Sequence, residues 1–314
     1  MRAVTTIFPV IFMIGIGTFS RIRGFITPSQ KDGANKIVFN ILFPIMIFNI
    51  LFTSKLETSA IFIVLYVFIA YCVILFIGRF IINFTGEKFA HISPYLLTTC
   101  EGGNVALPLY LSIVGASSNT VIFDLVIFDL AGVFMAFVII PIMVARAGAG
   151  ETRIRELIKT ILTNSFVIAV ILGLGLNLLG TYNFLSNSSY LGIYSNTITQ
   201  VTAPIVGVIL FIIGYDLNIN MEILGAVLKL LVARIIFYIL VIIGFFIFFP
   251  GLMIDKVFMI AVLIYFMSPT GFAIPMQISP LYKSNDDCGF ASAIISLNMI
   301  ITLVVYALIV VFIA

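Results

Sequence analysis

Two stretches of the chain, Glu101-Gly-Gly-Asn-Val-Ala-Leu-Pro108-Leu and Ser268-Pro-Thr-Gly-Phe-Ala-Ile-Pro275-Met, decide the fold, because each interrupts an apolar segment. They align without a gap at a spacing of 167 residues. Proline removes an intrahelical hydrogen bond and glycine lets the backbone leave the helix, so each stretch predicts a broken helix. Gly and Pro are common in membrane helices, but two breaks at matching places indicate an internal repeat.

The composition around these stretches is that of a membrane protein. Of 314 residues, 62% are hydrophobic and 9% are charged, and the mean hydropathy is +1.26. Soluble domains carry about 25% charged residues. Since the connections between apolar runs are short and polar, we expect an all-α fold of ten transmembrane helices. The runs fall at 4–20, 37–54, 60–82, 93–115, 120–145, 160–180, 197–215, 222–249, 256–279 and 289–313.

The repeat extends beyond the two breaks. Phe43-Pro44 in the second run matches Ala203-Pro204 in the seventh. We therefore predict one five-helix repeat over 1–145, a linker over 146–160 and a second repeat over 161–314. An odd number of helices per half forces opposite orientations in the membrane, and such inverted repeats are typical of secondary transporters, with the broken helices crossing at mid-membrane.

The distribution of Lys and Arg predicts the orientation. Thirteen of the sixteen cations fall in one set of loops, which includes 146–160, and three fall in the other set. Positive loops stay cytoplasmic. We expect a multi-pass protein of the cell membrane with both termini extracellular, the linker cytoplasmic and an uncharged extracellular loop at 181–196.

Several classes of function are not supported by the sequence. The basic residues lie in short loops between helices, which argues against nucleic-acid binding, and no serine, aspartyl or zinc protease motif or nucleotide-binding loop is present, so we expect no enzyme. Cys72, Cys100 and Cys288 have no paired spacing, and His91 is the single histidine, so we expect neither a metal nor a cofactor.

Acidic residues at membrane depth are the first candidates for function. Glu101 immediately precedes the first break, and Asp129 lies deep in the fifth run. Intramembrane carboxylates usually mark ion or proton pathways, and burial disfavours their charged form. We expect Glu101 and Asp129 to carry the coupling proton or ion, with a structural, hydrogen-bonded Glu101 as the alternative.

Polar groups at the two breaks are the candidates for binding the substrate. They are Gly103 and Asn104 in the first break, Thr270, Gly271 and Gln277 in and after the second, and Asn298 in the tenth run. Half-helix N-termini carry roughly +0.5 of a charge, so an anion is expected at their crossing. Asn298 could instead be an interhelical hydrogen-bonding residue. Arg234 is expected to snorkel to the inner interface or to reach the anion.

The Gly103-Asn104-x-x-x-Pro108 element, Pro275, the Pro44 and Pro204 pair and the ten-run layout resemble the auxin efflux carrier family, whose prokaryotic members include malate and malonate permeases. The resemblance covers essentially the whole chain. It implies a scaffold of segments 1, 2, 6 and 7, a mobile transport unit with crossed broken helices, elevator-like motion and a homodimer. The long hydrophilic central loop of the plant members is absent here, so auxin is a poor guess for the substrate.

These features together predict a secondary active transporter for a small mono- or dicarboxylate such as malate or malonate, driven by protons or by the membrane potential. Two alternatives remain open at this point. One is a sodium-coupled organic anion symporter of the related bile-acid type, and the other is an anion channel.

Overall fold

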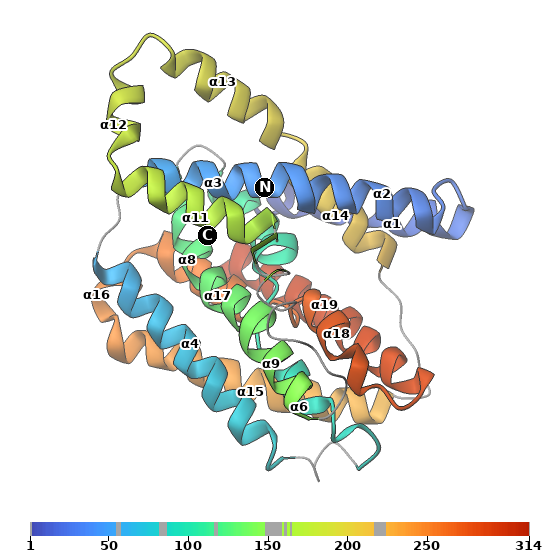
Figure 1. Ribbon diagram of the computed structural model, residues 1–314. Helices are drawn as coiled ribbons and strands as arrows, with labels where there is room; N and C mark the ends of the chain where they lie inside the picture. The colour runs from blue at the N-terminus through green and yellow to red at the C-terminus, as the bar shows by residue number, and fades with distance from the viewer. Residues whose placement is uncertain are drawn as a thin grey trace.

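The computed structural model describes residues 2–54, 58–81, 87–115, 119–147, 159, 162–163, 165–216 and 224–313. All regular structure in these ranges is helical (Figure 1), which confirms the all-α prediction. Six described helices are long and apolar enough to cross a membrane: Pro28–Thr53, Ala60–Gly78, Phe123–Val144, Leu191–Tyr215, Leu224–Phe248 and Asp286–Phe312. Most of the predicted linker 146–160 lies outside the described residues.

The first half of the chain contains the following helices: α1 (Arg2–Arg23), α2 (Pro28–Ile37), η1 (Val38–Leu42), α3 (Phe43–Thr53), α4 (Thr58–Gly78), η2 (Glu87–Phe89), α6 (Ser93–Leu97), η3 (Gly102–Ala106), α7 (Leu107–Val114), α8 (Asn119–Phe134), η4 (Met135–Ile139) and α9 (Ile140–Arg146). Helices α2, η1 and α3 run on without a gap, and so do η3 and α7. The Thr27 side chain caps α2, and Pro28 occupies its first turn, where no backbone N–H is needed.

The second half contains α11 (Ser165–Leu178), α12 (Thr181–Ser186), α13 (Leu191–Thr202), α14 (Ile205–Asp216), α15 (Leu224–Phe248), α16 (Pro250–Met253), α17 (Lys256–Phe266), α18 (Ala273–Ile278), η5 (Ser279–Leu281) and α19 (Asn285–Phe312). The extracellular loop predicted at 181–196 is wrong as a loop, because α12 and the start of α13 occupy it. The two helices stand at the edge of the molecule (Figure 1).

Both predicted interruptions are present. The helix of the fourth run stops at Leu97 and resumes at Gly102, and the helix of the ninth run stops at Phe266 and resumes at Ala273. We call residues 98–101 the first break and residues 267–272 the second break. Pro108 and Pro275 lie after these breaks, in the first turns of α7 and α18. A proline is tolerated there, and the turn before Pro108 is the wide π-helical turn η3.

Two helix pairs pack through glycine. Helix α1 packs on α14, where Gly17 lies against the carbonyl of Phe211 and Gly214 lies against the carbonyl of Ile14. Helix α3 packs on α11, where Gly173 lies against Phe48. Small residues let helix backbones approach closely in membranes, where packing rather than hydrophobicity drives association.

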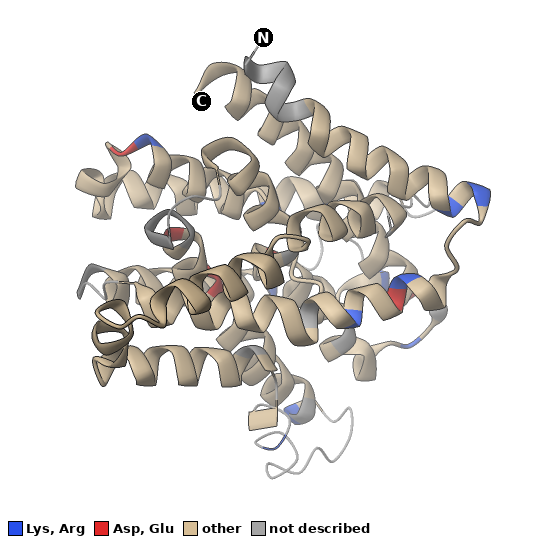
Figure 2. Cartoon of the chain, turned by 90° about the horizontal axis from the view of Figure 1, so that it is seen from above, with Lys and Arg blue, Asp and Glu red and all other residues tan. Residues whose placement is uncertain are grey.

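Large apolar side chains are exposed along the outer helices. They include Ile61, Phe62, Leu65 and Ile69 on α4 and Ile236, Ile239, Leu240 and Ile243 on α15. Soluble proteins rarely expose contiguous apolar surfaces of this kind. Charged residues are few, and most of the Lys and Arg positions lie towards helix ends (Figure 2). The structure therefore has the surface of a membrane protein.

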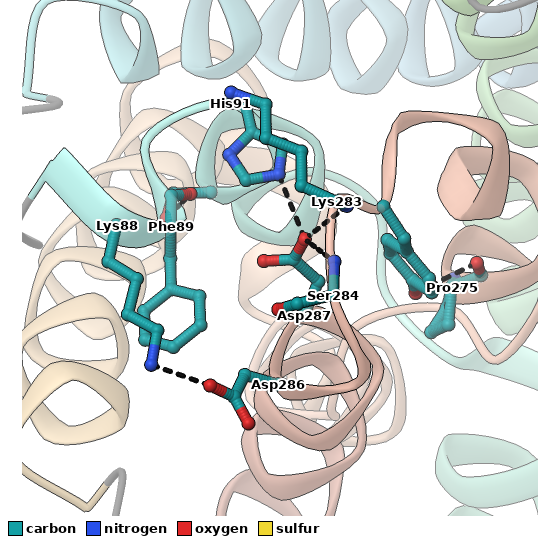
Figure 3. A network of polar contacts seen from close by, with 10 residues as sticks. Lys88, Phe89, His91, Pro275, Lys283, Ser284, Asp286 and Asp287 are labelled. Atoms are coloured by element: carbon teal, nitrogen blue, oxygen red, sulfur yellow. Dashed lines mark hydrogen bonds and ion pairs between the residues drawn. The ribbon is translucent and has the colours of Figure 1, made fainter.

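A polar cluster, which we call the clasp, ties η2 to the start of α19 (Figure 3). The buried carboxylate of Asp287 lies 3.2 Å from Nε2 of His91 and accepts hydrogen bonds from the backbone N–H groups of Lys283 and Ser284. Lys88 forms a 2.7 Å ion pair with Asp286, and the rings of Phe89 and Phe290 stack 4.0 Å apart. The clasp thus links the chain before the first break to the chain after the second.

Candidate functional site

The two breaks lie side by side and hydrogen-bond to each other. The backbone N–H of Glu101 in the first break donates to the carbonyl of Pro269 in the second, at 2.8 Å. The hydroxyl of Thr270 donates to the carbonyl of Leu96, at 2.6 Å. A break in a membrane helix frees backbone groups that need new partners, and here each break supplies partners to the other.

Arg234 of α15 supplies further donors to both breaks. Its guanidinium donates to the carbonyls of Leu97 (2.8 Å), Thr99 (2.7 Å) and Ser268 (3.1 Å), and it stacks on the ring of Tyr238 with 4.4 Å to the centroid. The side chain is 2% exposed, so the prediction that Arg234 snorkels to an interface is wrong. Five N–H donors in a rigid fork suit several carbonyls at once, which explains why arginine stands here.

A cavity of about 370 Å³ opens beside the crossed breaks. One wall comes from the breaks and from η3, α8 and η4, with Glu101, Gly103, Asp129 and Gly271 among its residues. The facing wall comes from α2, η1, α3 and α11 and includes Asn35, Asn40, Phe43 and Ser165. The cavity therefore joins four of the residues predicted for the site with side chains from helices of both halves of the chain.

Each acid of the cavity binds a backbone N–H at the start of a second half-helix. The carboxylate of Glu101 accepts from the N–H of Phe272, immediately before α18. Asp129 is partly buried, accepts from the N–H of Gly102 at the start of η3 and lies 3.4 Å from the hydroxyl of Tyr265. The two acids lie close enough to repel each other when both are charged. Two carboxylates therefore lie together in the lining of one cavity.

Glycines make this contact possible. The carboxylate of Asp129 occupies the place that a Cβ on Gly102 would fill, and the ring of Phe43 occupies the corresponding place beside Gly103. A side chain at either position would displace a wall of the cavity. Gly103 thus packs against the ring of Phe43 at the cavity. The sequence predicted a substrate contact for this residue.

Thr99 is strained and has an unpaired polar atom. It is the one residue other than glycine with a positive φ in the described part of the chain, at 56°. A β-branched residue in this region costs about 1–3 kcal/mol. Its hydroxyl is buried and has no hydrogen-bond partner among the residues that the structure describes, and Thr99 is one of the residues that line the cavity. An unpaired buried hydroxyl costs a further 1–3 kcal/mol or so.

Thr270, Asn298 and Gln277 are not among the described residues that line the cavity. Thr270 is buried and bonded to Leu96, as described above. Asn298 on α19 is buried, and its amide lies 3.5 Å from the carbonyl of Ser268, which fits the interhelical alternative. Gln277 is partly buried on α18. Asn104 lies within η3, and its side chain is outside the described part of the structure.

Sequence reasoning missed the amides of the facing wall. Asn35 and Asn40 are five residues apart, which places them on different faces of a regular α-helix. The intervening π-helical turn η1 hydrogen-bonds from i to i+5 and brings both to the cavity. The position of these two asparagines at the edge of an apolar run was the feature of the sequence that could have indicated a polar cavity wall.

No group of three or more His, Cys, Asp or Glu residues that could hold a metal ion occurs in the part of the chain that the structure describes. The chemistry of the site is that of two carboxylates, hydroxyls, amides and backbone N–H groups. No protein-family model matches the chain, and a search of curated proteins gives no match.

Proposed function

We propose that the protein is a secondary transporter that carries a small organic acid across the membrane together with a proton. The single observation behind the proposal is the cavity beside two crossed helix breaks, with Glu101 and Asp129 in one wall. An organic anion entering this cavity meets two acids that repel it and each other. Protonation of an acid removes that repulsion, so the anion and the proton bind together.

Protonation also frees donors for the anion. Glu101 and Asp129 hold the N–H groups of Phe272 and Gly102, which are the positive ends of half-helices. A protonated acid is a weaker acceptor, and the freed N–H can bind the carboxylate of the substrate. The same two residues would then bind the proton and release backbone N–H groups to the anion.

We infer that the protein moves its site by an elevator motion. The proposed scaffold is α1, α2 to α3, α11 and α14, and the remaining helices form the transport unit. Two observations support this division. The cavity has one wall from each group, and the scaffold pairs α1 with α14 and α3 with α11, which are the equivalent contacts of two halves related by a two-fold axis. The resemblance to the auxin efflux carrier family implies the same division.

Uptake into liposomes tests the proposal. Purified protein should accumulate labelled malonate against its gradient when the outside is made acidic. In Glu101→Gln, accumulation should fall to passive equilibration while exchange of internal for external malonate continues, because the amide cannot release a proton. Glu87→Gln is the control, since Glu87 is exposed in η2. Undiminished accumulation in Glu101→Gln would refute proton coupling through this residue.

A sodium-coupled symporter is the second candidate. Thr99, Glu101 and Asp129 place a hydroxyl and two carboxylates in one cavity, and these are oxygen ligands that a hard cation prefers. Replacement of sodium by potassium at a fixed proton gradient distinguishes the two: a sodium symporter loses uptake, and a proton symporter keeps it. A channel would show no acceleration of uptake by internal malonate.

A further inference from the structure

Two buried tyrosines form a hydrogen-bonded chain that ends at Asp129. The hydroxyl of Tyr71 on α4 donates to the hydroxyl of Tyr265 on α17 at 3.0 Å. The hydroxyl of Tyr265 lies 3.1 Å from the carbonyl of Phe128 and 3.4 Å from the carboxylate of Asp129. Both tyrosines are fully buried, so bulk water does not compete for these bonds.

The direction of donation along this chain follows from the chemistry of its groups. A phenol has one hydrogen to donate, and a carbonyl oxygen or a charged carboxylate can only accept. The hydrogen of Tyr265 therefore goes to Phe128 or to Asp129, and Tyr71 is the donor between the two tyrosines. Neighbouring hydrogen bonds polarise one another, so the bond from Tyr71 strengthens the bond that Tyr265 donates.

Only one of the two acceptors of Tyr265 can change its charge. The carbonyl of Phe128 is always neutral, whereas Asp129 lines the cavity and can carry a charge or a proton. A hydrogen bond to a charged group is roughly twice as strong as one between neutral groups. The hydroxyl is therefore placed to donate to Asp129 while this residue is charged, and to Phe128 once Asp129 holds a proton.

A second titratable group, Glu101, acts on Asp129 in the opposite sense. Among the elements packed against α8, the first break presents Glu101 to Asp129, and α17 presents Tyr265. A charged Glu101 disfavours a charge on Asp129, whereas an O–H donor favours it. Gly132 of α8 leaves room for that donor, because a Cβ there would lie 3.1 Å from the hydroxyl of Tyr265.

We propose that Tyr265, oriented by Tyr71, is a positioning residue for the coupled proton: its hydroxyl stabilises the charged form of Asp129 and so sets the pH at which Asp129 takes up a proton. This assignment rests on the proposed function, in which an acid of the cavity binds the proton that accompanies the anion. The hydrogen of Tyr265 stays on its own oxygen, and only the acceptor of its hydrogen bond changes.

The test follows the protonation of Asp129 directly and through transport. Infrared spectra of the purified protein without substrate, recorded over a series of pH values, show the C=O band of the protonated carboxyl group, and loss of the band in Asp129→Asn assigns it. Malonate uptake into liposomes is measured over the same external pH values. Tyr265→Phe removes the hydroxyl and keeps the ring. Tyr306→Phe is the matched control, because Tyr306 is also buried but its hydroxyl bonds to Ser112 of α7.

The two variants should differ in their pH dependence. In Tyr265→Phe, both midpoints should move to higher pH by about one unit, a tenfold gain in proton affinity, because the charged form of Asp129 loses a donor. The shift is at the low end for a hydrogen bond to a charged group, since the bond is 3.4 Å long. Tyr306→Phe should leave both midpoints unchanged, although each substitution removes a buried hydrogen bond and lowers the Tm. A purely structural role of Tyr265 would change the Tm alone.

Tyr71→Phe is a second variant that keeps Tyr265 in place. We expect a shift in the same direction of at most about twofold in proton affinity, because Tyr265 remains a donor. Combined with Tyr265→Phe, it should add nothing, since Tyr71 acts only through Tyr265. A further shift in the double variant would contradict the proposed chain.

Two other results would overturn the assignment. An infrared midpoint unchanged in Tyr265→Phe, or a band that does not titrate, refutes the control of Asp129 by Tyr265, and the proposed function then depends on Glu101. A shifted infrared midpoint with an unshifted uptake profile shows that the proton of Asp129 is not the coupled one. If the wild type transports no malonate, malate, lactate or acetate, the proposed function fails, and the infrared titration still decides whether Tyr265 controls Asp129.

Discussion

Arg234 shows how one residue satisfies the backbone of two broken helices. Its guanidinium reaches carbonyls on both sides of the crossing, from Leu97 to Ser268, while it remains buried among apolar helices. Burying a cation is costly unless it is well hydrogen-bonded. The cost is offset here because the carbonyls would otherwise lie unpaired at membrane depth.

Replacement of Arg234 should therefore destabilise the region where the two breaks hydrogen-bond to each other. Arg234→Gln leaves several break carbonyls without donors, and we expect at least about 3 kcal/mol of lost stability. Arg234→Lys should be nearly as damaging, since a single ammonium cannot serve carbonyls on both breaks. The Tm in detergent measures the effect. Lys229→Gln, on the exposed side of the same helix, should change the Tm little, and equal losses in both variants would contradict this role.

Glu101 and Thr99 differ from Arg234 in what they contribute. Arg234 holds the breaks together, whereas the two residues of the first break line the cavity. Within the described ranges, Thr99 combines a positive φ with a buried hydroxyl that has no hydrogen-bond partner there. Arrangements that cost stability in this way occur where a site needs a group in a fixed position.

At the scale of elements, the helix pairs of the proposed scaffold depend on the absence of side chains. Gly17 on α1 touches the main chain of α14, and Gly214 on α14 touches the main chain of α1. The hydroxyl of Thr18 adds a 2.7 Å hydrogen bond to the carbonyl of Gly214. Close backbone approach of this kind maximises packing between membrane helices.

Gly17→Ala should separate α1 from α14. The new methyl group would overlap the carbonyl of Phe211, which belongs to the backbone and cannot rotate away. We expect a loss of about 1–3 kcal/mol, as for other overpacked positions. Gly15→Ala on the same helix is the control, because nothing lies within 4 Å of its added Cβ. Thermal unfolding of both variants would show the difference, and equal Tm values would argue against a tight contact.

In the whole molecule, the outer faces of the long helices are apolar and polar side chains line an internal cavity. The outer faces of α4 and α15 expose large apolar side chains, and the polar cavity is lined by residues of α2, η1, α3, α8, η4 and α11 and of the two breaks. The proposed elevator motion would carry the cavity wall that holds Glu101 and Asp129 past the wall that holds Asn35 and Asn40. We expect the apolar outer faces to contact lipid during this motion.

The orientation of the whole molecule can be tested by labelling. We expect α12 outside and the region of Lys159 inside, as the asymmetry of Lys and Arg predicts. In a Cys288→Ser background, Ser186→Cys should react with an impermeant maleimide in intact cells, and Lys159→Cys should react only after permeabilisation. Lys159 is exposed, and Ser186 is partly exposed. Labelling of Lys159→Cys in intact cells would show that this region is extracellular and would contradict the predicted orientation.

The sequence by itself determined the helical fold, the positions of both breaks and the acids Glu101 and Asp129. These follow from local properties: apolar composition, the backbone chemistry of Gly and Pro, and the rarity of charge in an apolar run. The helical content of 181–196 was not predictable in this way, because its uncharged polar sequence is equally compatible with a loop.

Only the tertiary structure decided which groups pair across the breaks. Arg234 contacts carbonyls more than a hundred positions away in the chain, and Asn35 and Asn40 both line the cavity because of a π-helical turn. The hydroxyl of Thr99 has no partner among the described residues. A freed carbonyl can accept from any nearby donor, and what is near is set by the packing of whole helices. No local pattern carries that information, so the partners of the broken backbone, and the hydroxyl left without one, emerge only when the chain is folded.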